Sequence, residues 1–233
     1  MKSLTFLLLY FSLNCFSQTA EEYIKSGIEK DALKDYQGAI RDFTKAIEID
    51  PSFGEIYNFR GLSKAKLEDY RGAIIDYSKA AELNPKESEN YYNIGVSKAM
   101  LNDWKSAINF YTKAIEFNPK LEVSYFNRGV AKAKLEDYRG AIIDYNKAIM
   151  LNPSDWDFFY NRGNAKITLK DFQGAIIDFS KALELNPKFA YAYHNRGVAK
   201  ILINLKNSGC LDLSKAGELG YGGAYESIKK YCN

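Results

Sequence analysis

A period of 34 residues runs through the sequence, and it restricts the possible folds more than any other feature. The segment Lys64–Tyr77, KAKLEDYRGAIIDY, returns unchanged as Lys132–Tyr145, two periods later. Residues that recur at this spacing are Gly27, Gly61, Gly95, Gly129, Gly163 and Gly197; Ala46, Ala80, Ala114, Ala148, Ala182 and Ala216; and Pro51, Pro85, Pro119, Pro153 and Pro187. Such a period is typical of chains that stack one supersecondary unit many times, because a single unit cannot bury its apolar face alone.

Each repeat has the pattern of two helices separated by a short turn. In the fourth repeat, residues 125–135 follow a helical spacing, a break occurs at Glu136–Asp137, and residues 138–149 carry a second apolar stripe before Pro153. A glycine inside a helix costs about 1 kcal/mol relative to alanine, so the recurring glycines indicate close helix crossing. The predicted organisation is repeats 20–53, 54–87, 88–121, 122–155, 156–189 and 190–221, followed by a cap helix over about 222–232.

The recurring residues resemble the pattern of the tetratricopeptide repeat (TPR) family. With positions counted from the first residue of each repeat, the family has an aromatic residue at position 4, glycine at 8, alanine at 20 and 27, an aromatic residue at 24 and proline at 32. Position 4 is Tyr23, Tyr57, Tyr91, Tyr125, Phe159 and Tyr193, and position 24 is Phe43, Tyr77, Tyr111, Tyr145, Phe179 and Leu213. Repeat six departs from the pattern at Gly209 and Tyr221, as terminal repeats often do.

The resemblance implies an all-α fold: a right-handed superhelical solenoid of six antiparallel helix hairpins with a C-terminal capping helix. It also implies a concave groove, lined by the first helices, that holds a protein or peptide partner. A consistent departure is lysine in place of the family's aromatic residue at position 11: Lys30, Lys64, Lys98, Lys132, Lys166 and Lys200.

Asparagines at position 6 are the first candidate ligand contacts. In some members of the family, such a ladder of asparagines bonds an extended peptide backbone, because an amide both donates and accepts. The candidates are Asn93, Asn127, Asn161 and Asn195, beside Tyr92, Phe126, Tyr160 and His194 at position 5. Lys25 and Phe59 replace asparagine in repeats one and two, so the predicted ligand groove is C-terminal. The alternative is that these asparagines only connect neighbouring helices. The carboxylate clamp of chaperone-binding members needs lysine at position 5 and is absent.

Oppositely charged residues at positions 7 and 23 are interpreted as structural ion pairs within a hairpin. The predicted pairs are Arg60–Asp76, Arg128–Asp144, Arg162–Asp178 and Arg196–Asp212. In repeat three both positions change together, to Ile94 and Phe110, as expected if the two side chains meet. Repeat one breaks the rule, with Ser26 against Asp42. Anion binding by the arginines is the alternative.

The first residues have the pattern of a secretory signal peptide: one lysine, an apolar run, then small and polar residues. We expect cleavage after Ser17, so that residues 1–17 leave and the solenoid of residues 18–233 begins at Gln18. A lipoprotein anchor on Cys15 is the alternative, although Leu13 and Asn14 fit the required motif poorly. Export to the periplasm, the outer surface or the medium is predicted, with no transmembrane segment in the mature chain.

A disulfide between Cys210 and Cys232 is the next prediction. These are the two cysteines that remain once the signal peptide is removed, and an exported protein reaches a compartment where disulfides persist. Cys210 is placed near the start of the last repeat's second helix and Cys232 at the end of the cap helix. Because the chain turns near Gly220, an antiparallel arrangement brings both to the same end. Two unpaired cysteines are the alternative.

No motif for catalysis, a metal or a cofactor occurs. His194 is the only histidine, and the chain has neither a phosphate-binding GxxxxGK[ST] loop nor a dinucleotide-binding GxGxxG motif. The formal net charge is only +3 and acidic and basic residues are interspersed, so no nucleic-acid contact is expected. The favoured function is a non-enzymatic interaction module for a protein or peptide. The alternatives are a nucleic-acid-binding helical repeat and an accessory subunit of an envelope enzyme complex.

Overall fold

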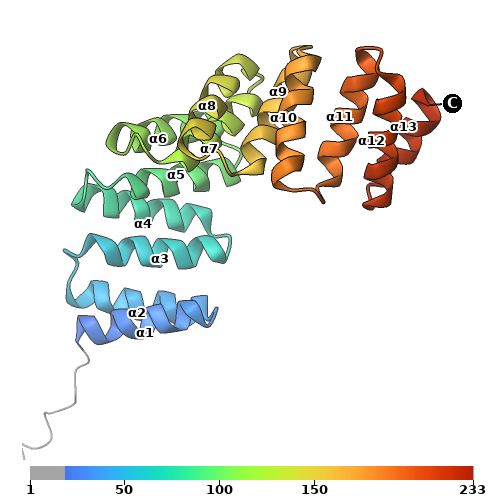
Figure 1. The fold of residues 1–233 in the computed structure, drawn as a ribbon. Helices are drawn as coiled ribbons and strands as arrows, with labels where there is room; N and C mark the ends of the chain where they lie inside the picture. The colour runs from blue at the N-terminus through green and yellow to red at the C-terminus, as the bar shows by residue number, and fades with distance from the viewer. Residues whose placement is uncertain (1–18, 233) are drawn as a thin grey trace, which may run out of the picture. The chain divides into compact units, whose positions relative to one another are not determined.

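The computed structural model describes residues 19–232, which contain thirteen α-helices and no strand (Figure 1). The first helices of the hairpins are α1 (Ala20–Ala32), α3 (Gly54–Lys66), α5 (Ser88–Met100), α7 (Glu122–Lys134), α9 (Trp156–Thr168) and α11 (Ala190–Leu202). The second helices are α2 (Tyr36–Ile49), α4 (Tyr70–Leu83), α6 (Trp104–Phe117), α8 (Tyr138–Leu151), α10 (Phe172–Leu185) and α12 (Lys206–Glu218), and α13 (Gly223–Tyr231) follows. The expected signal peptide, its cleavage site and Cys15 lie outside the described residues.

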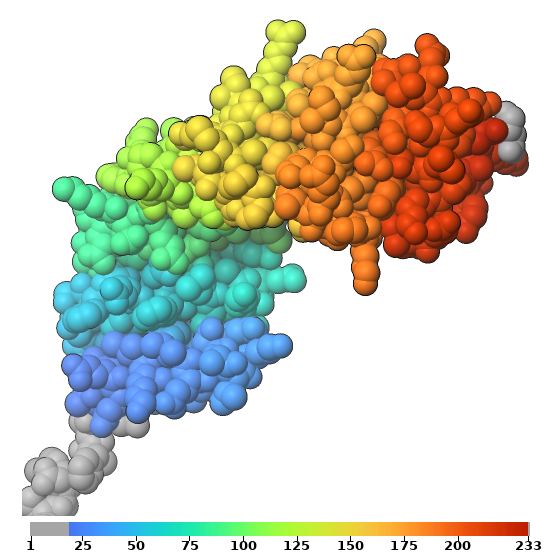
Figure 2. Space-filling view, viewed as in Figure 1, coloured from blue at the N-terminus to red at the C-terminus, as the bar shows by residue number. Residues whose placement is uncertain are grey.

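The chain forms two compact units, which divide within α5 after Ser97. In the first unit, α1 pairs with α2, α3 pairs with α4, and α2 packs on α3. In the second, the hairpins α7–α8, α9–α10 and α11–α12 pack in sequence, and α13 lies on α12. Within each unit the hairpins follow one another in chain order (Figures 1 and 2). The predicted all-α architecture of helical hairpins is confirmed.

The turn inside each hairpin is built by two adjacent residues. The residue at position 15 has a φ between 60° and 65°, a left-handed conformation that ends the first helix. These residues are Lys34, Glu68, Asn102, Glu136, Lys170 and Asn204. The aspartate at position 16 then caps the second helix: Asp137 Oδ1 accepts a 2.9 Å bond from the Gly140 amide. Asp35, Asp69, Asp103 and Asp171 cap α2, α4, α6 and α10 in the same way. The acidic pair Glu136–Asp137 therefore builds the turn rather than a reactive site.

Small residues let the two helices of a hairpin approach closely. The alanines at position 27 are buried in every repeat. In repeats one, two, four and five, the aromatic ring at position 24 lies against the glycine at position 8. A Cβ on Gly129 would lie 2.7 Å from Tyr145 Cε1 and 3.2 Å from the Ala141 carbonyl oxygen. In these four repeats, the close packing expected from the glycine at position 8 is contact with the aromatic ring of the same hairpin.

We predict that Gly129→Ala lowers the free energy of unfolding by about 1–3 kcal/mol, because the buried Tyr145 ring must move. Gly217→Ala is the matched control: the nearest atom to its added Cβ is Tyr225 Cζ at 3.6 Å. That variant should gain up to about 1 kcal/mol from helix propensity. Urea unfolding followed by circular dichroism measures both, and two changes of the same sign would contradict the packing account.

Neighbouring hairpins are joined through the proline at position 32. The Tyr91 hydroxyl donates a 3.0 Å bond to the Pro85 carbonyl oxygen, and Tyr57 and Tyr125 repeat this contact at Pro51 and Pro119. Proline cannot continue a helix, so its carbonyl is available to the next repeat. Among residues 19–232, no helix combines the length and the apolar character that crossing a bilayer requires.

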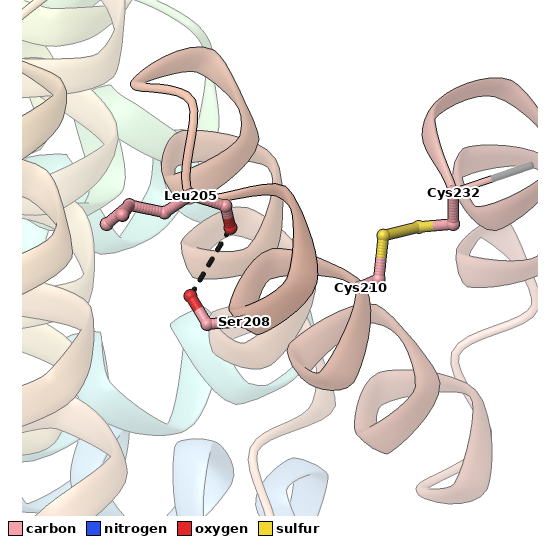
Figure 3. Close-up of a disulfide and its surroundings, with 4 residues drawn as sticks. All are labelled: Leu205, Ser208, Cys210 and Cys232. Carbon is pink, nitrogen blue, oxygen red and sulfur yellow. Dashed lines mark hydrogen bonds between the residues drawn. A yellow bond between two sulfur atoms is a disulfide. The ribbon is translucent and has the colours of Figure 1, made fainter.

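The last repeat differs from the others because its helices cross more closely. A Cβ on Gly209 would lie 2.7 Å from the Gly197 carbonyl oxygen, so alanine at position 20 would not fit here. Leu205 stands where the other repeats have the capping aspartate, and Ser208 Oγ donates to its carbonyl at 3.3 Å instead (Figure 3).

Cys210 in α12 is joined to Cys232, just beyond α13, by a disulfide with a Cα–Cα distance of 5.9 Å (Figure 3). The chain reverses between the two helices at Gly220, whose φ is 91°. The bond therefore ties the final helix to the last hairpin.

Candidate functional site

The candidate ligand residues all lie on first helices, which carry positions 5 and 6. Asn93 is in α5, in the first compact unit, and is buried. Its Nδ2 has no hydrogen-bond partner among the described residues. Asn127, Asn161 and Asn195 are half-buried in α7, α9 and α11 of the second unit. These three helices pack in sequence, so the second unit presents amides at one register along successive helices.

Asn161 is oriented by its own helix. Its Nδ2 donates to the Asp157 carbonyl oxygen at 2.9 Å and to Asp157 Oδ1 at 2.8 Å. Burial raises the pKa of Asp157, and the neighbouring Asp155 carboxylate adds to the effect. The side-chain oxygen of Asn161 has no partner in the described part of the chain. The amide is thus held with its acceptor available.

Asn195 belongs to a polar network that crosses α9, α11 and α13. Its Nδ2 donates to Asn164 Oδ1 at 2.8 Å and to the Tyr160 hydroxyl at 3.3 Å. His194 Nδ1 lies 3.1 Å from Asn195 Oδ1, and its Nε2 lies 2.9 Å from Ser227 Oγ in α13. His194 therefore links the last hairpin to the final helix, a contact that the repeat pattern did not indicate.

The aromatic residues at position 5 pack between hairpins. The Phe126 ring lies 4.8 Å from that of Phe158, and the Tyr160 ring lies 4.7 Å from that of Phe189, centroid to centroid. Tyr92, like these, is half-buried. Burial raises the pKa of Tyr160, against the hydrogen bonds from Asn164 and Asn195. In the second unit, Phe126 and Tyr160 therefore contribute to packing between neighbouring hairpins.

A buried aspartate with two cationic partners occupies the core of four hairpins. Asp144 accepts from Arg128 Nε at 2.9 Å and Nη2 at 2.6 Å, and from Lys132 Nζ at 2.7 Å. The same triads are Arg60–Asp76–Lys64, Arg162–Asp178–Lys166 and Arg196–Asp212–Lys200. The lysine at position 11, noted in the sequence as a departure, adds a second cation to each Arg–Asp pair, so that each aspartate accepts from two positive groups.

Each arginine also reaches the preceding hairpin. Arg128 Nη1 donates to Thr112 Oγ1 at 3.0 Å, and Arg60 and Arg196 donate in the same way to Thr44 and Ser180. In repeat five the acceptor is Asn146 Oδ1, at 2.7 Å from Arg162 Nη1. With all these donors engaged inside the protein, the geometry gives the arginines a structural role.

Repeats one and three vary this arrangement. In repeat one, Ser26 Oγ donates to Asp42 at 2.6 Å and Lys30 also bonds that carboxylate. Burial acts to raise the pKa of Asp42, but the bonds from Lys30 and Ser26 hold it below its ordinary value. In repeat three the aspartate is absent, and Lys98 lies 3.4 Å from Asp103 instead. The serine that seemed to break the rule in repeat one is therefore a neutral donor to the same carboxylate.

Among residues 19–232, no three His, Cys, Asp or Glu side chains lie together as they would around a metal ion.

This chain matches models of a known family and resembles several solved structures. Models described as tetratricopeptide repeat match residues 20–53, 54–87, 88–121, 123–155 and 156–189. These matches cover more than half of the chain. No curated protein is significantly similar to it.

Three solved structures illustrate the likeness in fold. A structure described as MamA protein shares 26% identity and a TM-score of 0.68, and the match covers 74% of this chain and 94% of that one. YrrB, described as a TPR protein with an unusual peptide-binding site, shares 23% identity and a TM-score of 0.71 over 81% of this chain and 97% of that one. Pseudomonas aeruginosa pilF shares 14% identity and a TM-score of 0.76 over 91% and 96%.

Proposed function

Because the chain belongs to the tetratricopeptide repeat family, we propose that it is a non-enzymatic interaction module that holds a peptide or protein segment on the first-helix face of its second unit. The observation that carries this proposal is the orientation of Asn161. Two hydrogen bonds to Asp157 fix its amide and leave its side-chain oxygen to accept from a ligand. A backbone N–H of an extended peptide is the matching donor.

We predict that Asn127→Ala combined with Asn161→Ala weakens peptide binding while the protein stays folded. Each lost hydrogen bond contributes about 1 kcal/mol, so two correspond to roughly a thirtyfold weaker Kd. Peptides are selected on the purified protein from a random-peptide display library, and their Kd is then measured by fluorescence polarisation. Circular dichroism and thermal unfolding report the fold.

The matched control removes two exposed amides from second helices of the same unit, Gln173→Ala with Asn207→Ala. This variant should bind the selected peptides as the native protein does. Equal Kd values for both double variants would assign Asn127 and Asn161 to structure. A failure to select any peptide above background would remove the peptide-binding proposal itself.

We also propose that the protein is exported and starts at Gln18 after removal of its signal peptide. The disulfide supports this location, since such bonds persist in oxidising compartments. N-terminal sequencing of the protein from its native cells should read Gln18. A start at Met1, or a lipid on Cys15, would contradict the proposal.

A further inference from the structure

A cavity in the first unit has chemistry unlike that of the face formed by Asn127, Asn161 and Asn195. It has a volume of about 460 Å³ and lies between α1 and α3. Its lining residues are Ile28, Asp31, Ala32, Phe43, Phe59 and Leu62. This volume falls within the range of sites that hold a ligand or a large side chain.

Three departures from the chain's own repeat pattern meet in this cavity. Position 12 is Asp31 in repeat one, whereas the other repeats have alanine or isoleucine there. Position 13 is Ala32, the smallest residue at that position, where repeat three has Met100. Position 6 is Phe59 in repeat two, where the next four repeats have asparagine. Since these residues come from two repeats, their convergence on one cavity is not explained by the stacking that all repeats share.

The cavity combines an apolar floor with a single carboxylate. The rings of Phe43 and Phe59 stack with a centroid distance of 5.8 Å and an interplanar angle of 28°. Asp31 Oδ1 accepts a 2.6 Å bond from Ser63 Oγ, which fixes the carboxylate against the wall. Its Oδ2 has no partner among residues 19–232. Ile28 is 46% exposed at the mouth, so the cavity opens to solvent.

The charges beside the mouth favour a cation. An adjoining cavity of about 400 Å³ shares Ile28 and is lined also by Glu21, Ile24, Lys25 and Glu29. With Asp31, these residues place three carboxylates against one ammonium group around a continuous apolar surface. A negatively charged ligand would meet repulsion here, whereas a positively charged one would be attracted.

We propose that this cavity is an anchoring site for a peptide segment in which a large apolar side chain is flanked by lysine or arginine. The apolar side chain fills the space over Phe43 and Phe59, and the flanking cation pairs with Asp31. The inference rests on the proposed function only in taking the ligand to be a peptide. The residues that it involves lie in the first unit, whereas the proposed function places the ligand on the second.

The test uses three capped peptides: Gly-Lys-Phe-Lys-Gly, Gly-Glu-Phe-Glu-Gly and Gly-Lys-Ala-Lys-Gly. Each is titrated into the isotope-labelled protein and followed by the amide chemical shifts of α1 and α3. The Lys-Phe-Lys peptide should bind most tightly. Asp31→Asn, which keeps an acceptor for Ser63, should weaken its binding roughly fivefold, as expected for a partly exposed charge pair. Ala32→Met, which fills the cavity with the residue of repeat three, should abolish it.

Glu48→Gln is the matched control, because it removes an exposed carboxylate from α2, away from the cavity lining. It should bind the Lys-Phe-Lys peptide as the native protein does. Equal binding of the Lys-Phe-Lys and Glu-Phe-Glu peptides, unchanged binding by Ala32→Met, or no shift in α1 and α3 at millimolar peptide would overturn the proposal. Asn127 and Asn161 do not line this cavity, so their variants leave it intact. A result that overturns the proposed role of these asparagines would therefore not affect the proposal for the cavity.

Discussion

Asp144→Asn is expected to lower the free energy of unfolding by about 3–5 kcal/mol, the range found when one partner of a buried ion pair is removed. The Asp144 side chain is only 2% exposed and accepts from both Arg128 and Lys132. Asparagine would place a neutral amide between two cations that remain in the hairpin core. Guanidinium unfolding of the native protein and the variant measures the difference.

Repeat three supplies the control for this experiment. There the pair is replaced by Ile94 and Phe110, so the same apolar pair can be placed in repeat four as Arg128→Ile with Asp144→Phe. The double variant should lose less stability than Asp144→Asn alone, because no aspartate or arginine is left buried without its partner. A larger loss in the double variant would mean that the hairpin depends on the ion pair itself.

Removing the disulfide is expected to lower the free energy of unfolding by about 3 kcal/mol, because the bond closes a loop across a sequence separation of 22 residues. Cys210→Ser with Cys232→Ser tests this in a thermal unfolding experiment. The loss should appear first in α13, which packs mainly on α12 and is otherwise held by the His194–Ser227 hydrogen bond.

Alkylation gives an independent check of the bond. In denatured, unreduced protein both thiols should be protected from the reagent, and they should react after reduction. Reaction of both cysteines without reductant would show that the mature protein lacks the bond. If the thiols are protected, an unchanged melting temperature in the double serine variant would show that the bond does not stabilise the last hairpin.

The sequence was sufficient for the hairpins because their determinants are local and recur. Glycine at position 8 and the break at positions 15 and 16 each act within one repeat, and proline at position 32 ends the second helix. The repetition shows each pattern several times. The clash partner of Gly129, the Tyr145 ring, also lies in the same repeat. The all-α architecture of helical hairpins was therefore predictable from the sequence.

The sequence predicted only two of the three residues in each ion-pair cluster. Positions 7 and 23 were paired because they change together in repeat three, whereas the lysine at position 11 does not change with them. Yet positions 7 and 11 are four residues apart on one helix and face the same neighbour. That spacing was the signal that would have placed Lys132 beside Asp144.

The ligand face was the least predictable part. Asparagine at position 6 has the same pattern whether it binds a ligand or a neighbouring helix. In the structure, Asn195 donates to α9 and Asn161 donates to Asp157 of its own helix. Its role in binding stays a prediction. The cavity near Phe59 was missed because its carboxylate, Asp31, comes from the preceding repeat.

The bond from each arginine to the preceding hairpin gives the chain a nearest-neighbour coupling. In a one-dimensional array, stability is the sum of intrinsic terms for each repeat and interface terms between neighbours. Arg162 contributes to both kinds of term: it bonds Asp178 within its own hairpin and Asn146 in the preceding hairpin. A substitution there changes cooperativity as well as stability. Ile94 cannot donate such a bond, so the series of couplings is interrupted once, between repeats two and three, whereas Arg128 still couples repeat four to repeat three. Repeats one and two can therefore respond to denaturant separately from repeats three to six.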